Sequence, residues 1–536
     1  MRKRIFKQET MVNIKQYINS DRFNVYQRNE AGLTPLMLAA KDNPNINIIM
    51  SLMEKGAEVN NRDKIGRTAL MYAAKENPNP QIVSTLIEHG AKVEATDKDN
   101  RTALMYAAQE NSNPQVIRTL INSGAKVNAY DKDNRISLMF AAYKNDNSEI
   151  LEVLINNGAK LETRDKYGRT ALMYAVASNF NLEIITTLIH NGAKIEVREE
   201  NEKTALMIAA EYNLNPKILI TLIENGVDVK ARDKDGLTAL MYAACKNGNP
   251  EILDVLINNG AKIKARDKDG FTALMYAAAN TSNLKIITTL IDNGAKINTR
   301  DKKGLTPLMY AAQENTNPEI ITTLLNHGAE IEARDKDDFS ALMYAAANSS
   351  ASKIITSLIS NGAKIEVEDN KKKTILMYAV QYNPNSEVIL TLLNNGVQID
   401  TKDENEKTAL MYAAADNENP KVLTTLFSNG AKVNVKDKEE KNALIYASQS
   451  NSNSEVIKAL INNGAEVNVQ DKKEKTPLIY AAEKNSNPEI IETLLANGAD
   501  AKLKDTNNKL AIDYADENQS LKNTETYWKL NDRSFN

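Results

Sequence analysis

A period of 34 residues runs through this chain and dictates its architecture. The leucine of the recurring string T-A-L-M-Y-A-A returns at that interval, without insertion or deletion, from Leu36 to Leu478. A glycine keeps the same interval from Gly56 to Gly498, and these fourteen positions hold most of the chain's 21 glycines. Such a period predicts an array of similar units, each contacting its neighbours, rather than several globular domains.

One unit, residues 97–130, shows the predicted local structure. Residues 102–108 form a short helical segment rich in alanine, and Asn113 with Pro114 marks the start of a second helix. Gly124 ends that helix as a left-handed C-cap, and a polar loop leads into the next unit. The second helix carries apolar pairs four residues apart, Val116-Ile117 and Leu120-Ile121. One unit cannot bury this stripe alone, but stacked neighbours can.

This pattern resembles the ankyrin repeat. The strings Thr34-Pro35-Leu36-Met37-Leu38-Ala39-Ala40 and Thr306-Pro307-Leu308-Met309-Tyr310-Ala311-Ala312 come closest to the family's T-P-L-H-x-A-A signature. The resemblance covers about residues 29–518 and implies an all-α repeat solenoid of about fourteen stacked repeats. We expect an N-terminal capping half-repeat at 1–28, fourteen repeats at 29–504 and a degenerate C-terminal capping repeat at 505–536.

The sequence departs from the family's pattern in three respects. The unit has 34 residues rather than 33, the second signature position is mostly alanine, and methionine replaces the family's histidine, as at Met71 and Met105. A thioether packs well but is a weak hydrogen-bond acceptor. We therefore expect neighbouring loops to be held more by packing than by side-chain hydrogen bonds. The tyrosines that recur with Tyr72 and Tyr106 are expected to have a structural packing role.

Composition argues against catalysis and against metal binding. The chain has one cysteine, Cys245, and three widely separated histidines, His89, His190 and His327, so neither a nucleophilic triad nor a zinc site is expected. The net charge is −3, and aspartates interleave with the basic loop residues, which disfavours nucleic acid as a partner. We expect no cofactor and no enzymatic activity.

Hydropathy indicates where such a chain would act. No stretch of about 18 apolar residues occurs, so no transmembrane helix is expected. Polar residues interrupt the basic amino terminus, which makes it a poor signal peptide. We expect a cytoplasmic, monomeric protein, while export into a host cell stays open.

The resemblance implies that partners bind to the loop tips and to the concave face of the first helices. On that face, the residue before the signature threonine is basic in most units but apolar in four consecutive ones, at Leu237, Phe271, Leu305 and Phe339. We predict that these four residues, Cys245 nearby, and Tyr143, Tyr167 and Tyr212 contact a partner. The alternative is that the four apolar side chains pack along the row of loops and stabilise the array.

The leading functional hypothesis is a protein-interaction scaffold. The alternatives are a spacer whose stacking is its function and a surface that binds polyanions. From residue 368 onward the loop tips lack glycine, with Lys372 and Glu406 where a left-handed backbone is expected. We predict that these loops are more mobile than those at Gly236, Gly270 and Gly304.

Overall fold

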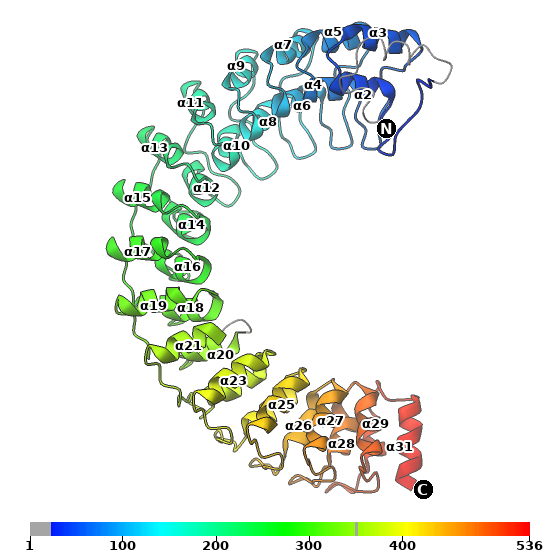
Figure 1. Cartoon of the computed structure of the whole chain (residues 1–536), viewed down its shortest axis with the longest axis vertical. Helices are drawn as coiled ribbons and strands as arrows, with labels where there is room; N and C mark the ends of the chain where they lie inside the picture. The colour runs from blue at the N-terminus through cyan, green and yellow to red at the C-terminus, as the bar shows by residue number, and fades with distance from the viewer. Residues whose placement is uncertain (1–22, 349–351, 536) are drawn as a thin grey trace. The chain divides into compact units, whose positions relative to one another are not determined.

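The computed structural model describes residues 23–348 and 352–535, which form an all-α array of helix pairs (Figure 1). This confirms the predicted repeat solenoid. Within those ranges there is no strand, only an isolated bridge between Glu368 and Thr374. The chain comprises two compact units, residues 1–268 and 269–536, which are built on the same plan.

In its described residues, 23–268, unit 1 contains seven helix pairs. Its first helices are α2 (Pro35–Asp42), α4 (Ala69–Glu76), α6 (Ala103–Glu110), α8 (Ser137–Lys144), α10 (Ala171–Ser178), α12 (Ala205–Tyr212) and α14 (Ala239–Lys246). Its second helices are α3 (Ile46–Glu54), α5 (Pro80–Glu88), α7 (Pro114–Asn122), α9 (Ser148–Asn156), α11 (Leu182–His190), α13 (Pro216–Glu224) and α15 (Pro250–Asn258). First helices pack on first helices of the next repeat, and second helices pack on second helices.

Unit 2 repeats this arrangement. Its first helices are α16 (Ala273–Asn280), α18 (Pro307–Glu314), α20 (Ala341–Ala347), α22 (Ile375–Tyr382), α24 (Ala409–Asp416), α26 (Ala443–Ser450), α28 (Pro477–Lys484) and α30 (Ala511–Ala515). Its second helices are α17 (Leu284–Asp292), α19 (Pro318–Asn326), α21 (Ser352–Ser360), α23 (Ser386–Asn394), α25 (Pro420–Ser428), α27 (Ser454–Asn462), α29 (Pro488–Ala496) and α31 (Glu525–Phe535).

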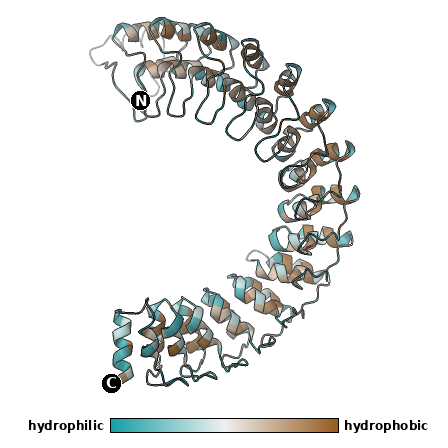
Figure 2. Ribbon diagram, turned by 180° about the vertical axis from the view of Figure 1, so that it is seen from behind, coloured by the Kyte–Doolittle hydropathy of each residue, from teal (hydrophilic) through white to brown (hydrophobic). Residues whose placement is uncertain are grey.

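The hydrophobic core lies between the helices of successive repeats. Leu104 and Met105 of α6 are buried, and so are Val116, Ile117 and Leu120 of α7. Full burial of such a side chain stabilises the fold by about 1.5–3 kcal/mol. Figure 2 shows hydrophobic residues on the helices and hydrophilic residues in the loops.

The predicted helix caps are confirmed. Asn113 accepts a hydrogen bond from the backbone N–H of Gln115, and Pro114 is the first residue of α7. Gly124 follows α7 with a φ of 94°, the left-handed conformation that glycine adopts without steric cost. The methionines at the signature position are buried, and the Met71 thioether accepts weakly from the Thr68 N–H at 3.5 Å.

Most of the predicted N-terminal capping half-repeat lies outside the described residues, which begin at residue 23. Ala351, which stands where other second helices have the capping asparagine, also lies outside them. The predicted boundaries at 28 and 504 therefore remain predictions.

The 34-residue interval from Leu494 predicts that Trp528 takes the position of the buried second-helix leucine, and this prediction is wrong. Trp528 is 58% exposed, whereas Leu530 is fully buried. The Asn518 amide donates to the carbonyl of Asn485, which lies 33 residues earlier, whereas the equivalent bond spans 34 residues in most other repeats. The 34-residue interval is therefore already lost before α31 begins.

Candidate functional site

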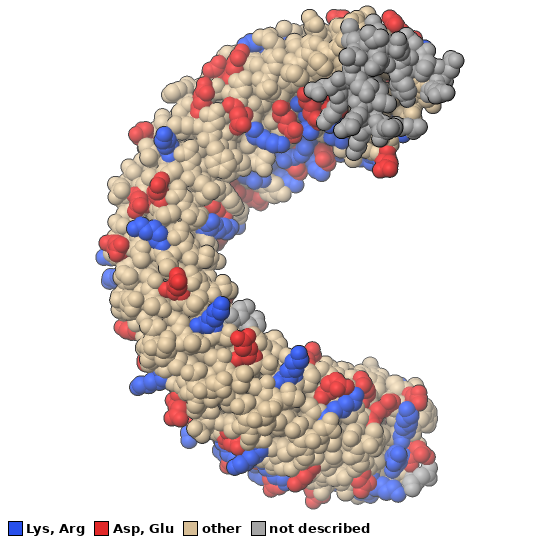
Figure 3. Space-filling model, in the orientation of Figure 1, with Lys and Arg blue, Asp and Glu red and all other residues tan. Residues whose placement is uncertain are grey.

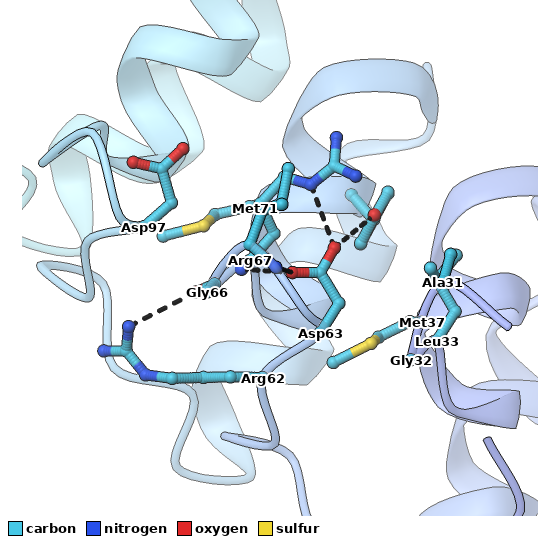
Figure 4. A network of polar contacts seen from close by, with 12 residues as sticks. Ala31, Gly32, Leu33, Met37, Arg62, Asp63, Gly66, Arg67, Met71 and Asp97 are labelled. Carbon is cyan, nitrogen blue, oxygen red and sulfur yellow. Dashed lines mark hydrogen bonds and ion pairs between the residues drawn. The ribbon is translucent and has the colours of Figure 1, made fainter. Parts of the chain in front are cut away.

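Most loops are organised around one aspartate, as Figure 4 shows for Asp63. Asp63 accepts hydrogen bonds from the backbone N–H of Ile65 and of Arg67, from the Arg67 guanidinium at 3.0 Å and from the Tyr72 hydroxyl at 2.7 Å. Burial alone would raise the pKa of Asp63, but the hydrogen bonds from Tyr72 and Arg67 hold it below its usual value. Burial and Asp63 raise the pKa of Tyr72. The recurring tyrosine is therefore structural, as predicted.

Neighbouring loops are joined by hydrogen bonds, which corrects the expectation that packing would dominate. The guanidinium of Arg62 donates to the carbonyl of Gly66 at 3.3 Å in its own loop (Figure 4). It also donates to the carbonyl of Thr96 at 2.5 Å in the next loop. The backbone N–H of Lys98 also donates to the carbonyl of Ile65 at 3.0 Å. The expectation failed because it considered only the missing histidine, whereas arginine supplies several donors in a fixed geometry.

A ladder of buried asparagines links the first helices. In unit 1, the Asn111 amide donates to the carbonyls of Ala74 and Asn77 in the preceding repeat, at 2.8 and 2.9 Å. These carbonyls lie at the C-terminus of α4, where no helical donor remains, so the asparagine satisfies buried acceptors. We define the asparagine ladder as the buried residues that make this pair of bonds: Asn77, Asn111, Asn145, Asn179, Asn213 and Asn247 in unit 1 and Asn315, Asn383, Asn417, Asn451 and Asn485 in unit 2.

The residue before the signature threonine lies between tyrosine rings of successive repeats. In unit 2, the Lys373 ammonium lies 4.2 Å from the ring centroids of Tyr378 and Tyr412. Lys407 and Lys441 repeat this arrangement with the tyrosines that follow. The result is an alternating stack of cations and aromatic rings, an arrangement that stabilises both.

The four predicted apolar residues occupy the same position. Phe339 packs against Tyr344 and Tyr378, with ring centroids 5.4 and 4.6 Å apart. Phe271 packs in the same way against its own and the next tyrosine. Leu305 is buried and Leu237 is half-buried in its own unit. The alternative expectation, packing along the row of loops, thus has direct geometric support.

The predicted tyrosines lie in unit 1 and are exposed. Tyr143, Tyr167 and Tyr212 retain 42%, 44% and 54% of their accessible surface. The Tyr143 ring lies edge-on to Tyr174 with centroids 6.0 Å apart, and the Arg169 guanidinium lies over both Tyr167 and Tyr174 at 4.7 and 5.1 Å. We call Tyr143, Tyr167, Tyr174 and Arg169 the aromatic cluster.

Tyr212 and Cys245 border a buried ion-pair network that sequence reasoning missed. The Glu211 carboxylate is fully buried between Lys203 at 2.8 Å and Lys246 at 2.5 Å. Burial alone would raise the pKa of Glu211, but hydrogen bonds from the two lysines hold it below its usual value. Burial raises the pKa of the Cys245 thiol, so this side chain is not an activated nucleophile. The sequence signal for this network was Glu211 itself, a charged residue at a position that is small or apolar in the two neighbouring repeats, at Ala177 and Cys245.

The histidines have structural contacts. The Nδ1 atoms of His89 and His327 lie 2.8 and 2.7 Å from the carbonyls of Thr85 and Thr323, in the last turn of their helices. Among the described residues, no group of three or more His, Cys, Asp or Glu side chains could hold a metal ion. Within those same ranges no helix is long and apolar enough to cross a membrane.

Stacked helix pairs joined by polar loops define a helical-repeat protein. The model of the ankyrin repeats (three copies) matches the chain over residues 10–97, 36–131, 104–199, 138–233, 206–301, 296–369, 342–437 and 413–505. The chain therefore belongs to the ankyrin-repeat family. No curated protein matches it significantly. Ankyrin repeats are generally modules of protein–protein interaction, and the proteins that contain them are typically non-catalytic scaffolds.

Proposed function

We propose that this protein is an interaction scaffold that binds a partner protein through its loops and the exposed ends of its first helices, without catalysis. The aromatic cluster of unit 1 is the observation that carries the proposal. Tyrosine and arginine are enriched among residues that dominate binding energy, because they bury a large area and keep polar groups for hydrogen bonds. Tyr143 and Tyr167 expose nearly half of their surface in neighbouring repeats, although Tyr174 and Arg169 hold their rings in place.

The proposal includes all eight residues predicted from the sequence. Tyr143, Tyr167, Tyr212 and Cys245 would contact the partner directly. The four apolar residues, Leu237, Phe271, Leu305 and Phe339, are proposed to contribute through their exposed edges, while their buried parts support the neighbouring tyrosines. We further propose a cytoplasmic, monomeric protein that uses no cofactor.

The test is affinity capture with the full chain and a Tyr143/Tyr167/Tyr212→Ser variant. The matched control is Phe180/Leu214/Ile220→Ser, which removes three exposed apolar side chains at the turns between helices and on α13, with exposures of 59%, 51% and 37%. We expect a partner that is retained by the wild type and the control but lost by the tyrosine variant. Capture of the same proteins by all three would refute the proposed site, and a complete absence of partners would favour a spacer.

A second variant, Leu237/Phe271/Leu305/Phe339→Lys, separates the apolar residues from the tyrosines. Lysine occupies this position in other repeats, as at Lys373 and Lys407, and packs between tyrosine rings there. The variant is therefore expected to fold. Loss of the partner by this variant would assign the four apolar residues to the binding surface, and full retention would assign them to stacking alone.

A further inference from the structure

A polar pocket in unit 1 is lined by charged side chains, and not all of these take part in the contacts that hold the fold together. It has a volume of about 480 Å³ and lies between the loops that contain Ile65 and Lys98 and the helices α4 and α6. Cationic and acidic side chains line it together with Gln109 and one recurring tyrosine, Tyr106. Figure 3 shows basic and acidic side chains gathered over the loops of this part of unit 1.

The acidic groups of this pocket already have partners. Asp97 accepts a hydrogen bond from the Tyr106 hydroxyl at 2.6 Å, and Asp99 pairs with Lys132 at 2.6 Å. Glu110 is paired with two lysines, at 3.2 and 3.4 Å. None of these carboxylates therefore needs the remaining cations of the pocket.

Two cations are left without such partners. Within the described part of the chain, neither the guanidinium of Arg101 nor the ammonium of Lys98 makes a hydrogen bond, and Arg101 Nε is buried. Among the described residues, the one ion pair of the Arg101 guanidinium is with Asp131, whose carboxylate lies 3.9 Å from Nε. The equivalent arginines differ, because Arg67, Arg135 and Arg169 bond an aspartate of their own loop at 3.0, 2.9 and 3.1 Å.

The exception at Arg101 has a local structural context. Phe140 stands where most repeats have the tyrosine, so its ring offers no hydroxyl to Asp131. Arg135 takes that carboxylate with two bonds, at 2.9 and 2.7 Å. The Arg101 guanidinium instead lies over the Phe140 ring at 5.1 Å, and its donors remain available at the pocket.

We propose that this pocket binds a carboxylate side chain from an acidic peptide segment of the partner protein, with Arg101 and Lys98 as its ion-pair partners. The proposal rests on the proposed scaffold function and specifies the chemistry of the partner. A guanidinium matches a carboxylate with two parallel hydrogen bonds. Gln109 supplies a neutral amide, and Ile65 and Tyr106 supply apolar surface for the peptide. The three acidic side chains of the wall would repel an extended polyanion, so a discrete acid group fits better.

The test is fluorescence anisotropy of the full chain with a fluorescein-labelled decapeptide that carries one Glu between two Tyr residues and is otherwise Gly and Ser. A peptide with Gln in place of Glu and one with phosphoserine in place of Glu are measured beside it. We expect the Glu peptide to bind and the Gln peptide to bind about tenfold or more weakly, as the loss of a charge-assisted contact predicts. Arg101→Gln is expected to weaken Glu-peptide binding by a similar factor, and Lys98→Gln to weaken it less because Lys98 is exposed.

Arg118→Gln is the matched control, because it removes the same charge from α7, where Arg118 pairs with Glu149 at 3.3 Å. It should bind the Glu peptide as the wild type does. Arg101→Lys keeps the charge, and it should retain part of the binding. Circular dichroism melts establish that the variants are folded.

If Arg101→Gln and Arg118→Gln lost affinity for the Glu peptide equally, the peptide would be attracted by net charge alone, and the proposal would be overturned. So would equal binding of the Glu and Gln peptides, or binding of the phosphoserine peptide alone. These outcomes leave the affinity capture unaffected, so a scaffold with a different partner chemistry would still be recognised.

Discussion

Replacing Asn417 tests whether the asparagine ladder holds the stack together. This buried side chain donates to the carbonyls of Val380 and Asn383 at 2.7 and 2.9 Å, and it accepts from the backbone N–H of Asn419 at 3.0 Å. The helical donor for Val380 would be Pro384, which has no N–H. The Asn417 amide therefore satisfies an acceptor that the local backbone cannot.

Two substitutions separate the donors from the acceptor. Asn417→Thr keeps an acceptor for the Asn419 N–H, as the natural Thr281 does for Asn283 at 3.0 Å, but it leaves two buried carbonyls without a donor. Each unsatisfied buried group costs about 1–3 kcal/mol, so we expect the two together to lower the free energy of unfolding by about 2–6 kcal/mol. Asn417→Ala also leaves the Asn419 N–H unpaired and should cost about 1 kcal/mol more.

The assay is hydrogen exchange followed by mass spectrometry on the full chain, because a long repeat array does not unfold in one step. Exchange should accelerate in α22 and α24 and fade over the neighbouring repeats. Asn395→Ala serves as the control, since this exposed amide bonds only within its own helix end, to the Thr391 carbonyl. If Asn417→Thr exchanged like the wild type, the amide donors would contribute nothing and the reasoning would fail.

Three further predictions concern the loops. Glu474 has a φ of 56°, so Glu474→Gly should relieve about 1–2 kcal/mol of backbone strain in the folded loop and lose about 0.4–1 kcal/mol because glycine makes the unfolded chain more flexible. Hydrogen exchange in this loop should therefore slow in Glu474→Gly but not in Glu474→Ala. Uniform protection of all loops would contradict the predicted mobility. The pKa of Asp63 is lowered in the folded protein, so its contribution to the free energy of unfolding is complete above the unfolded value of 3.8 and is lost as pH falls through the folded pKa. Thermal melts of the wild type at decreasing pH should show this loss of stability, and those of Asp63→Asn should lack it. Burial lowers the pKa of Lys373 in the folded protein, so the unfolded chain binds more protons between the folded pKa and the unfolded value of 10.5. The free energy of unfolding of the wild type should therefore rise with pH over that range. Thermal melts at pH 7 and 10 should show this rise in the wild type but not in Lys373→Leu.

The regular part of the fold could be predicted because each signal is local and is repeated fourteen times. The period of Leu36, the cap at Asn113 and the left-handed Gly124 each depend on residues within a few positions along the chain. The contacts between repeats could not be predicted in this way. The Asn111 amide bonds a carbonyl 37 residues earlier, and nothing in its local spacing shows which way the side chain points.

The repeats themselves held a signal for the aspartate–tyrosine pair. Asp63 and Tyr72 recur nine residues apart through most of the chain. Where Ile208 replaces the tyrosine, Glu199 also replaces the aspartate, whereas Phe140 replaces the tyrosine without a change at Asp131. Comparison of these positions across repeats would have predicted the bond that the structure shows at 2.7 Å.

The candidate site was harder to predict, because one position serves two purposes. Lys373 and Phe339 each fill the gap between two tyrosine rings, one as a cation and the other as an aromatic ring. Either residue type stabilises the stack, so a change from lysine to phenylalanine along the sequence does not by itself indicate a partner.

Positions whose side chains make few contacts within the array carry more information about binding. Tyr143 and Tyr212 are such positions, and so is Arg101, whose guanidinium makes no hydrogen bond within the described residues. The exposed and unpaired side chains of unit 1, rather than the apolar row, therefore make the strongest case for where a partner binds.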